Sequence, residues 1–140
     1  DYDARVNVQW PFGYGRSYTT FSYANLRASS ATFSPDANLT FSIDVTNTGS
    51  RPGKEAVLLY SSDLVASIVP DNKRLRAFEK IELKPGETRT VTFTLPASDL
   101  AFVGADGKWV LEEGDFVITV GTEKVTVSCT STRRWDVPNI

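Results

Sequence analysis

Residues 39–46 read Leu-Thr-Phe-Ser-Ile-Asp-Val-Thr, an unbroken alternation of apolar and polar side chains. Successive side chains of a β-strand point to opposite faces of the sheet, so this period of two places Leu39, Phe41, Ile43 and Val45 on one face. The polar residues lie on the other face. The stretch therefore predicts a strand with one face buried in a core and the other in water.

The same pattern recurs outward from this segment, in residues 90–95, 116–120 and 125–127. Residues 55–60 are apolar on both faces, as expected for a central strand. Residues 75–83 alternate imperfectly, which predicts a bulge near Ala77. From the alternation, the predicted core consists of Phe41, Ile43, Val45, Val91, Phe93, Phe116 and Ile118.

Turn signals separate these segments: Asn47-Thr-Gly49, Arg51-Pro-Gly53, Pro85-Gly86, Asp106-Gly107, Glu113-Gly114 and Gly121-Thr122. About seven short strands without a long amphipathic helix predict an all-β fold, an antiparallel β-sandwich. Residues 96–100 are expected to form one helical turn at a corner. The predicted organisation is an extended aromatic arm (residues 1–17), the sandwich (18–130) and a C-terminal tail (131–140).

Composition narrows the possible functions. The chain has 140 residues, a net charge of -2 with both signs interspersed, no histidine and one cysteine. A domain of this charge pattern has no basic footprint for nucleic acid, and no apolar run reaches membrane-spanning length. Without histidine, Cys129 builds neither a Cys-His catalytic pair nor a usual zinc site, so we expect no cofactor and no metal. The missing initiator methionine and signal peptide indicate a fragment or processed chain.

Acidic residues are the remaining candidates for catalysis, because glycoside hydrolysis requires two carboxylates facing each other across a cleft. The candidates are Asp63, Asp71, Glu112, Glu113 and Asp115. Each lies in a turn or at a strand end among polar neighbours, and acidic side chains are mostly solvated. We therefore predict no catalytic residue in this chain.

Tryptophan side chains raise the alternative of carbohydrate binding, since planar rings stack on sugars. Trp109 precedes an apolar strand, where a ring more often closes the end of a sandwich, and the structural interpretation is favoured. Trp135 lies in a tail that either docks on the sandwich or is loose. A carbohydrate-binding or adhesion-type interaction module is thus the alternative function.

The arm is the most aromatic part of the sequence, with Trp10-Pro-Phe-Gly-Tyr-Gly followed by Arg-Ser-Tyr-Thr-Thr-Phe21. Rings on an irregular segment need a surface to cover, because their exposure to water is unfavourable. The sandwich already has a core, so we expect the arm to lie across a neighbouring domain. The candidate interdomain contacts are Trp10, Phe12, Tyr14 and Tyr18.

This order of residues also resembles the start of the fibronectin type III-like domain that ends many family 3 glycoside hydrolases. The resemblance continues through Asn47-Thr-Gly49 with Gly53-Lys-Glu-Ala-Val57, Leu75-Arg-Ala-Phe78 and Pro85-Gly-Glu87. The resemblance ends with Asp106-Gly-Lys-Trp109, Glu113-Gly114 and Val120-Gly121, and it covers most of residues 10–128.

The resemblance implies a sandwich of the fibronectin type III or immunoglobulin-like kind, and a parent enzyme of β-glucosidase or β-xylosidase type that retains configuration. In that family the catalytic Asp and the acid/base lie upstream of this domain, so no catalytic residue carries over. The implied role is to stabilise and dock the catalytic domains of the same chain, in a periplasmic or secreted enzyme. Family loops that approach the substrate entrance make the connection 62–74 a candidate substrate rim, with Asp63, Asn72 and Arg74.

Overall fold

The computed structural model describes residues 19–63, 73–103 and 107–136. Seven strands in this part have seven residues or more: β1 (Phe21–Ala28), β3 (Asn38–Asn47), β4 (Gly53–Asp63), β5 (Arg74–Leu83), β6 (Thr88–Pro96), β9 (Gly114–Val120) and β10 (Glu123–Cys129). Four shorter strands are β2 (Thr32–Phe33), β7 (Phe102–Val103), β8 (Lys108–Leu111) and β11 (Arg133–Asp136). The all-β fold predicted from alternation is confirmed.

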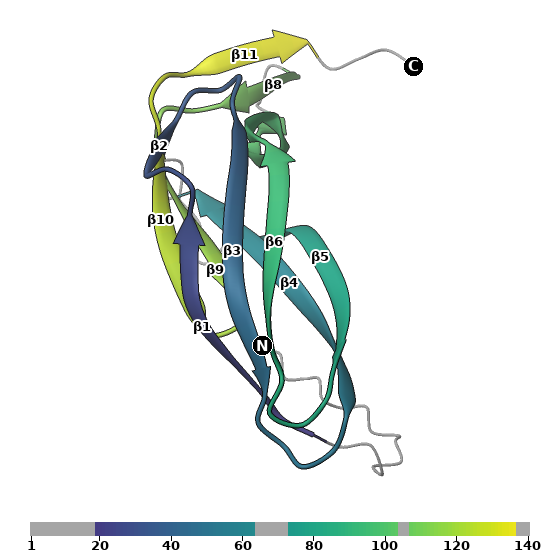
Figure 1. The fold of residues 1–140 in the computed structure, drawn as a ribbon. Coiled ribbons are helices and arrows are strands. Elements are labelled where there is room, and N and C mark those ends of the chain that lie inside the picture. Colours follow the sequence, from purple (N-terminus) through teal and green to yellow (C-terminus); the bar gives the residue numbers. More distant parts are fainter. Residues whose placement is uncertain (1–18, 64–72, 104–106, 137–140) are drawn as a thin grey trace.

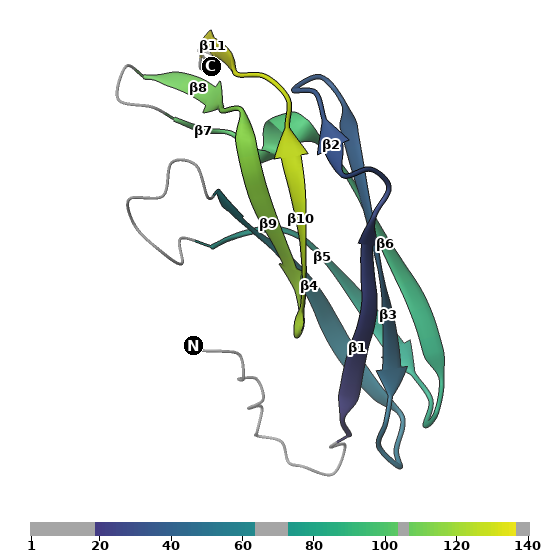
Figure 2. The ribbon, with the colours of Figure 1, turned by 90° about the vertical axis from the view of Figure 1, so that its left-hand side faces the viewer.

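The strands form two layers and a small third sheet. One layer has the order β1-β3-β6 and the other the order β2-β10-β9-β4-β5. Figure 2 shows the two layers side by side, and Figure 1 shows the third sheet, β11-β8-β7, at one end. The long strands pair antiparallel, and the short β2 runs parallel to β10. The fold is therefore an antiparallel sandwich.

The core lies between the two layers. All seven predicted core residues are buried, and Phe41, Ile43 and Val45 have no exposed surface. Phe41 and Phe93 are cross-strand partners on β3 and β6, and Phe116 contributes from the opposite layer. The period-two pattern thus identified the inward face of both sheets correctly.

Three local predictions are confirmed. Residues 55–60 lie in β4, which is flanked by strands on both sides. The pairing of β4 with β5 shifts because Leu59 faces Ala77 while Tyr60 faces Leu75, which leaves Arg76 as the extra residue of a bulge. Residues Ala97–Leu100 form the expected helical turn, the 3-10 helix η2.

The structure shows how part of the C-terminal tail is placed, which the sequence left open. Arg133–Asp136 form β11, which pairs with β8. An ion pair between Arg133 and Asp36 joins this strand to the turn before β3. Trp135 is half-buried against the core, so this part of the tail is docked on the domain. The arm, residues 1–17, lies outside the described residues.

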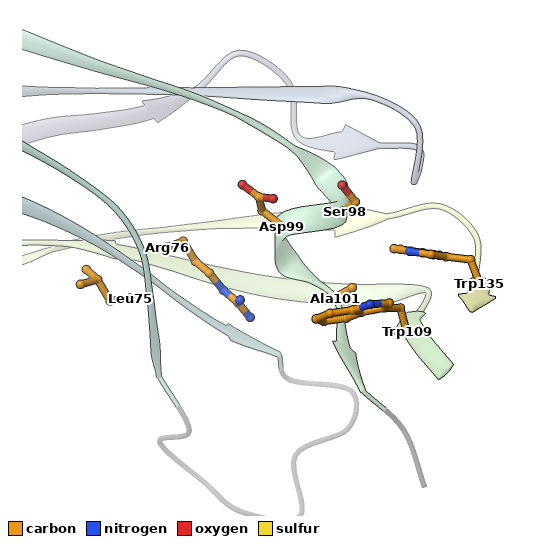
Figure 3. Close-up of a pocket in the computed structure, with 7 residues that line it drawn as sticks. All are labelled: Leu75, Arg76, Ser98, Asp99, Ala101, Trp109 and Trp135. Carbon is orange, nitrogen blue, oxygen red and sulfur yellow. The ribbon is translucent and has the colours of Figure 1, made fainter. Parts of the chain in front are cut away.

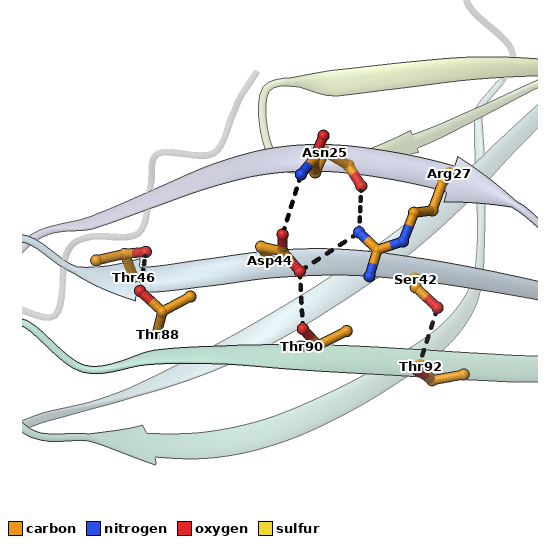
Figure 4. A network of polar contacts seen from close by, with 8 residues as sticks. All are labelled: Asn25, Arg27, Ser42, Asp44, Thr46, Thr88, Thr90 and Thr92. Carbon is orange, nitrogen blue, oxygen red and sulfur yellow. Dashed lines mark hydrogen bonds and ion pairs between the residues drawn. The ribbon is translucent and has the colours of Figure 1, made fainter.

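The outer face of β1-β3-β6 carries a polar network (Figure 4). Asp44 accepts hydrogen bonds from Thr90 at 2.8 Å and from Asn25 at 3.2 Å, and pairs with Arg27 at 3.4 Å. Asn25 has a φ of 62° at a bulge of β1, a conformation that asparagine tolerates better than most residues. The bonds from Thr90 and Asn25 lower the pKa of Asp44 from its ordinary value. This face is a solvated surface.

Candidate docking surface

The small sheet at one end of the sandwich places three apolar side chains in a row. Val103 pairs with Trp109, and Trp109 pairs with Trp135, across β7, β8 and β11. Directly paired residues of antiparallel strands lie on the same face of the sheet, so the three side chains are neighbours. Both tryptophans are half-buried against the core, whereas Val103 is 50% exposed.

A shallow hollow of about 420 Å³ lies beside this row. It is lined by Leu75, Arg76, Ser98, Asp99, Ala101, Trp109 and Trp135. In Figure 3 the Arg76 side chain extends from β5 toward Trp109, and Ser98 and Asp99 lie on the helical turn η2. The hollow therefore combines aromatic walls with a cation, a carboxylate and a hydroxyl.

A hydrogen bond to Ser61 holds Arg76 in place. Its Nε donates to the buried Ser61 Oγ at 2.9 Å. Within the described residues no carboxylate is close enough to form an ion pair with its guanidinium. Burial lowers the pKa of Arg76, the nearby charge of Arg74 lowers it further, and Asp99 opposes both effects. A half-buried cation of this kind is well placed to bind an acidic group from outside the described chain.

Exposed apolar residues occur on β5 and β7, and β5 also contributes Leu75 and Arg76 to the hollow. In the described part of the chain the exposed large hydrophobic residues are Leu75, Phe78 and Val103, with exposed fractions of 50%, 59% and 50%. Leu75 and Phe78 belong to β5, the edge strand of the five-stranded sheet. Aromatic residues and arginine are enriched in protein interfaces and dominate their energetics. We call Leu75, Arg76, Phe78, Val103 and Trp109 the end patch.

Two of the three candidate rim residues lie at the same end of the molecule. Asp63 ends β4 and Arg74 begins β5, so the two strand ends are adjacent in the sheet. Arg74 is exposed. Asn72 lies outside the described residues, as do the interdomain candidates Trp10, Phe12, Tyr14 and Tyr18. The end patch was not identified as a site from the sequence, although the broken alternation of residues 75–83 marks the bulge that turns Arg76 toward the hollow.

The candidate carboxylates in the described part of the chain lie near one another: Asp63 pairs with Phe116, next to Asp115, and Glu112 and Glu113 form the connection before β9. Glu113 is exposed, and its backbone amide donates a hydrogen bond to Thr132 Oγ1 at 3.0 Å. Asp115 is exposed and accepts a hydrogen bond from Ser128 at 2.6 Å. Asp71 lies outside the described residues. Among the described residues no group of three or more His, Cys, Asp or Glu side chains could hold a metal ion, and no helix is long and apolar enough to cross a membrane.

An antiparallel sandwich of a three-stranded and a five-stranded sheet has the architecture of a β-sandwich module of the fibronectin type III kind. The chain belongs to the family described as fibronectin type III-like domain, whose pattern matches residues 55–124. The resemblance inferred from the sequence motifs is thereby confirmed.

Similar proteins are far longer than this chain. Lysosomal β-glucosidase of Dictyostelium discoideum is 42% identical over a match covering 81% of this chain and 15% of that protein. Periplasmic β-glucosidase of Salmonella typhimurium is also 42% identical, and the match covers 90% of this chain and 16% of that protein. The structure of β-glucosidase 3B from Thermotoga neapolitana superposes with a TM-score of 0.76 at 34% identity, covering 89% of this chain and 18% of that one. The chain thus spans about a sixth of the length of these relatives.

Proposed function

We propose that this chain is a non-catalytic accessory domain of a family 3 glycoside hydrolase of β-glucosidase type, and that it stabilises the catalytic domains by docking on them. The observation that carries the proposal is the end patch, which combines exposed apolar side chains of β5 and β7 with a half-buried arginine that has no ion-pair partner among the described residues. The two relatives described above support this context, because both are much longer proteins named as β-glucosidases. From the same relationship we propose a periplasmic or secreted location for the parent enzyme.

The docked partner would be the catalytic part of the same parent chain. An apolar surface on that partner would cover Leu75, Phe78 and Val103, and an acidic side chain would pair with Arg76. The arm residues Trp10, Phe12, Tyr14 and Tyr18 remain proposed contacts with the same partner. Asp63, Asn72 and Arg74 remain proposed residues of the substrate rim, since the ends of β4 and β5 adjoin the end patch.

Docking is tested by Phe78→Asp. Phe78 is 59% exposed, so the substitution should change the stability of the isolated chain by less than about 0.5 kcal/mol, as is usual for surface positions. In the parent enzyme the same change would bury a carboxylate without a partner, and we expect the domain to unfold in a separate, earlier thermal transition. The control is Thr92→Asp on the exposed outer face of β6. Equal melting behaviour of the two parent variants would contradict docking through the end patch.

Carbohydrate binding at the hollow is the second candidate function. Trp109 and Trp135 line it together with Asp99 and Arg76, a combination of rings and polar groups that suits a sugar. We prefer docking because the exposed apolar residues extend beyond the hollow. Titration of the chain with cello-oligosaccharides should leave tryptophan fluorescence unchanged. A saturable change that is lost in Trp135→Ala would favour the binding module instead.

A further inference from the structure

Asn47, at the end of β3, is a fully buried polar residue whose side chain is saturated with hydrogen bonds. Its Nδ2 donates to the carbonyl oxygens of Arg51 at 2.8 Å and Leu83 at 3.0 Å. Its Oδ1 accepts from the Gly49 amide at 2.9 Å and from the Thr19 hydroxyl at 2.7 Å. Two donors and two accepting lone pairs are the full capacity of an asparagine side chain. Three of these partners lie within the strands and turns of the sandwich, and Thr19 precedes the first strand.

The two residues before β1 are held at this point by further bonds. The Thr48 amide donates to the Thr20 carbonyl at 2.8 Å. The hydroxyl groups of Thr20 and Thr48 are 2.7 Å apart and form another hydrogen bond. Residues 19 and 20 are therefore attached by backbone and side chain to the turn after β3, although neither belongs to a strand.

Gly49 and Gly53 provide the space for this attachment. Neither has a φ in the left-handed region, so the backbone does not require glycine at these positions. A Cβ at either position would instead overlap the side chain of Thr19. At Gly53 a Cβ would also lie 3.3 Å from the Phe21 ring. The sequence Asn47-Thr-Gly49 with Gly53 thus forms a cradle for one threonine, with an amide for its hydroxyl and open space for its methyl group.

We propose that this cradle is an anchoring site for the incoming chain, which fixes the point and direction at which the upstream polypeptide meets the sandwich. Interdomain connections pivot at residues that lack fixed contacts. Thr19 and Thr20 have several such contacts, so the cradle removes a pivot at the edge of the domain. In the parent enzyme the anchor would help to hold the sandwich in its docked orientation. For this role the inference rests on the docking proposed above.

The attachment is tested in the 140-residue chain by hydrogen exchange at the Thr48 amide. Thr19→Val keeps the shape of the side chain and removes its donor, and exchange at Thr48 should accelerate about 2- to 10-fold, as expected for the loss of one hydrogen bond. Thr19→Ser retains the hydroxyl and should have a smaller effect. Thr46→Val is the matched control, because it removes the 2.7 Å hydrogen bond between the hydroxyl groups of Thr46 and Thr88 on the outer face of the same sheet. Equal exchange at Thr48 in Thr19→Val and the native chain would overturn the cradle.

The role in the parent enzyme is tested with Gly53→Ala, whose methyl group displaces Thr19. We expect the accessory domain of the parent to melt separately and earlier than in the native enzyme, while Thr46→Val leaves a single transition. If Thr48 exchange accelerates in the isolated chain but the parent still melts in one transition, the anchoring role is overturned. The Phe78→Asp experiment tests docking independently of this result.

Discussion

At the residue scale, Tyr23 and Glu55 link the two layers of the sandwich. Tyr23 Oη donates to Glu55 Oε2 at 2.6 Å, from β1 in one sheet to β4 in the other. Burial raises the pKa of Tyr23, and the neighbouring Glu55 carboxylate raises it further. Burial also raises the pKa of Glu55, an effect that the hydrogen bond from Tyr23 partly offsets. The folded state therefore favours the neutral form of both side chains more strongly than the unfolded state does.

This linkage predicts the sign of a pH dependence. Because the folded-state pKa of Glu55 is raised, its contribution to stability is complete below the ordinary glutamate pKa and declines as pH rises through the folded-state value. Glu55→Gln stays neutral, so its stability relative to the native chain should increase across that interval. Chemical denaturation of both proteins over a pH series measures the difference.

Tyr23→Phe supplies the complementary control for this pair. It removes the hydrogen bond that lowers the pKa of Glu55, so the decline should move to higher pH. A stability difference between the native chain and Glu55→Gln that does not vary with pH would contradict the assignment. The native chain should also lose stability as pH rises above about 10, where tyrosine ionises in the unfolded state.

At the scale of elements, we expect the two ends of the chain to make different contributions to the isolated domain. β11 pairs with β8, its Arg133 forms an ion pair with Asp36, and its Trp135 packs against the core. Truncation after Thr130 should therefore lower the free energy of unfolding by about 1–3 kcal/mol, mainly through lost apolar burial. Chemical denaturation of the truncated and native chains is the measurement.

Deletion of residues 1–16 is the matched experiment at the other end. It leaves Thr19 and its hydrogen bond to Asn47 in place, so the melting temperature of the isolated chain should be nearly unchanged. Unfolding on this deletion would mean that the arm belongs to the core of this domain. Unchanged stability after the C-terminal truncation would mean that β11 contributes only pairing at the surface.

At the scale of the whole molecule, we expect the chain alone to hydrolyse no glycoside. Glu113 and Asp115 are exposed at a turn and do not line the hollow, whereas a retaining or inverting mechanism needs two carboxylates facing each other across one cleft. Incubation with aryl β-glucosides and β-xylosides should give no turnover above a heat-denatured sample. Turnover that disappears when Asp115 or Glu113 is replaced would place catalysis in this domain and overturn the accessory function.

The predictable part of the structure follows from short-range patterns. Alternation located the inward faces of β3, β6 and β9, because a one-residue shift would move every apolar side chain into water. The imperfect alternation of residues 75–83 predicted a bulge near Ala77, and the extra residue is its neighbour Arg76. The end patch was not predictable in this way, since it joins β5, β7 and β8, and sequence spacing does not show which strand ends meet.

By itself the sequence determined the fold class, the core faces, most of the turns and the family resemblance, because each depends on neighbouring residues or on ordered motifs. Only the tertiary structure decided that Trp135 docks beside Trp109, that Arg76 faces the hollow without an ion pair among the described residues, and that Asn47 joins the β3–β4 connection, the end of β5 and Thr19. Each of these depends on contacts between residues distant in sequence. Such contacts are set by the packing of the two layers and the small sheet, and local sequence patterns do not predict them.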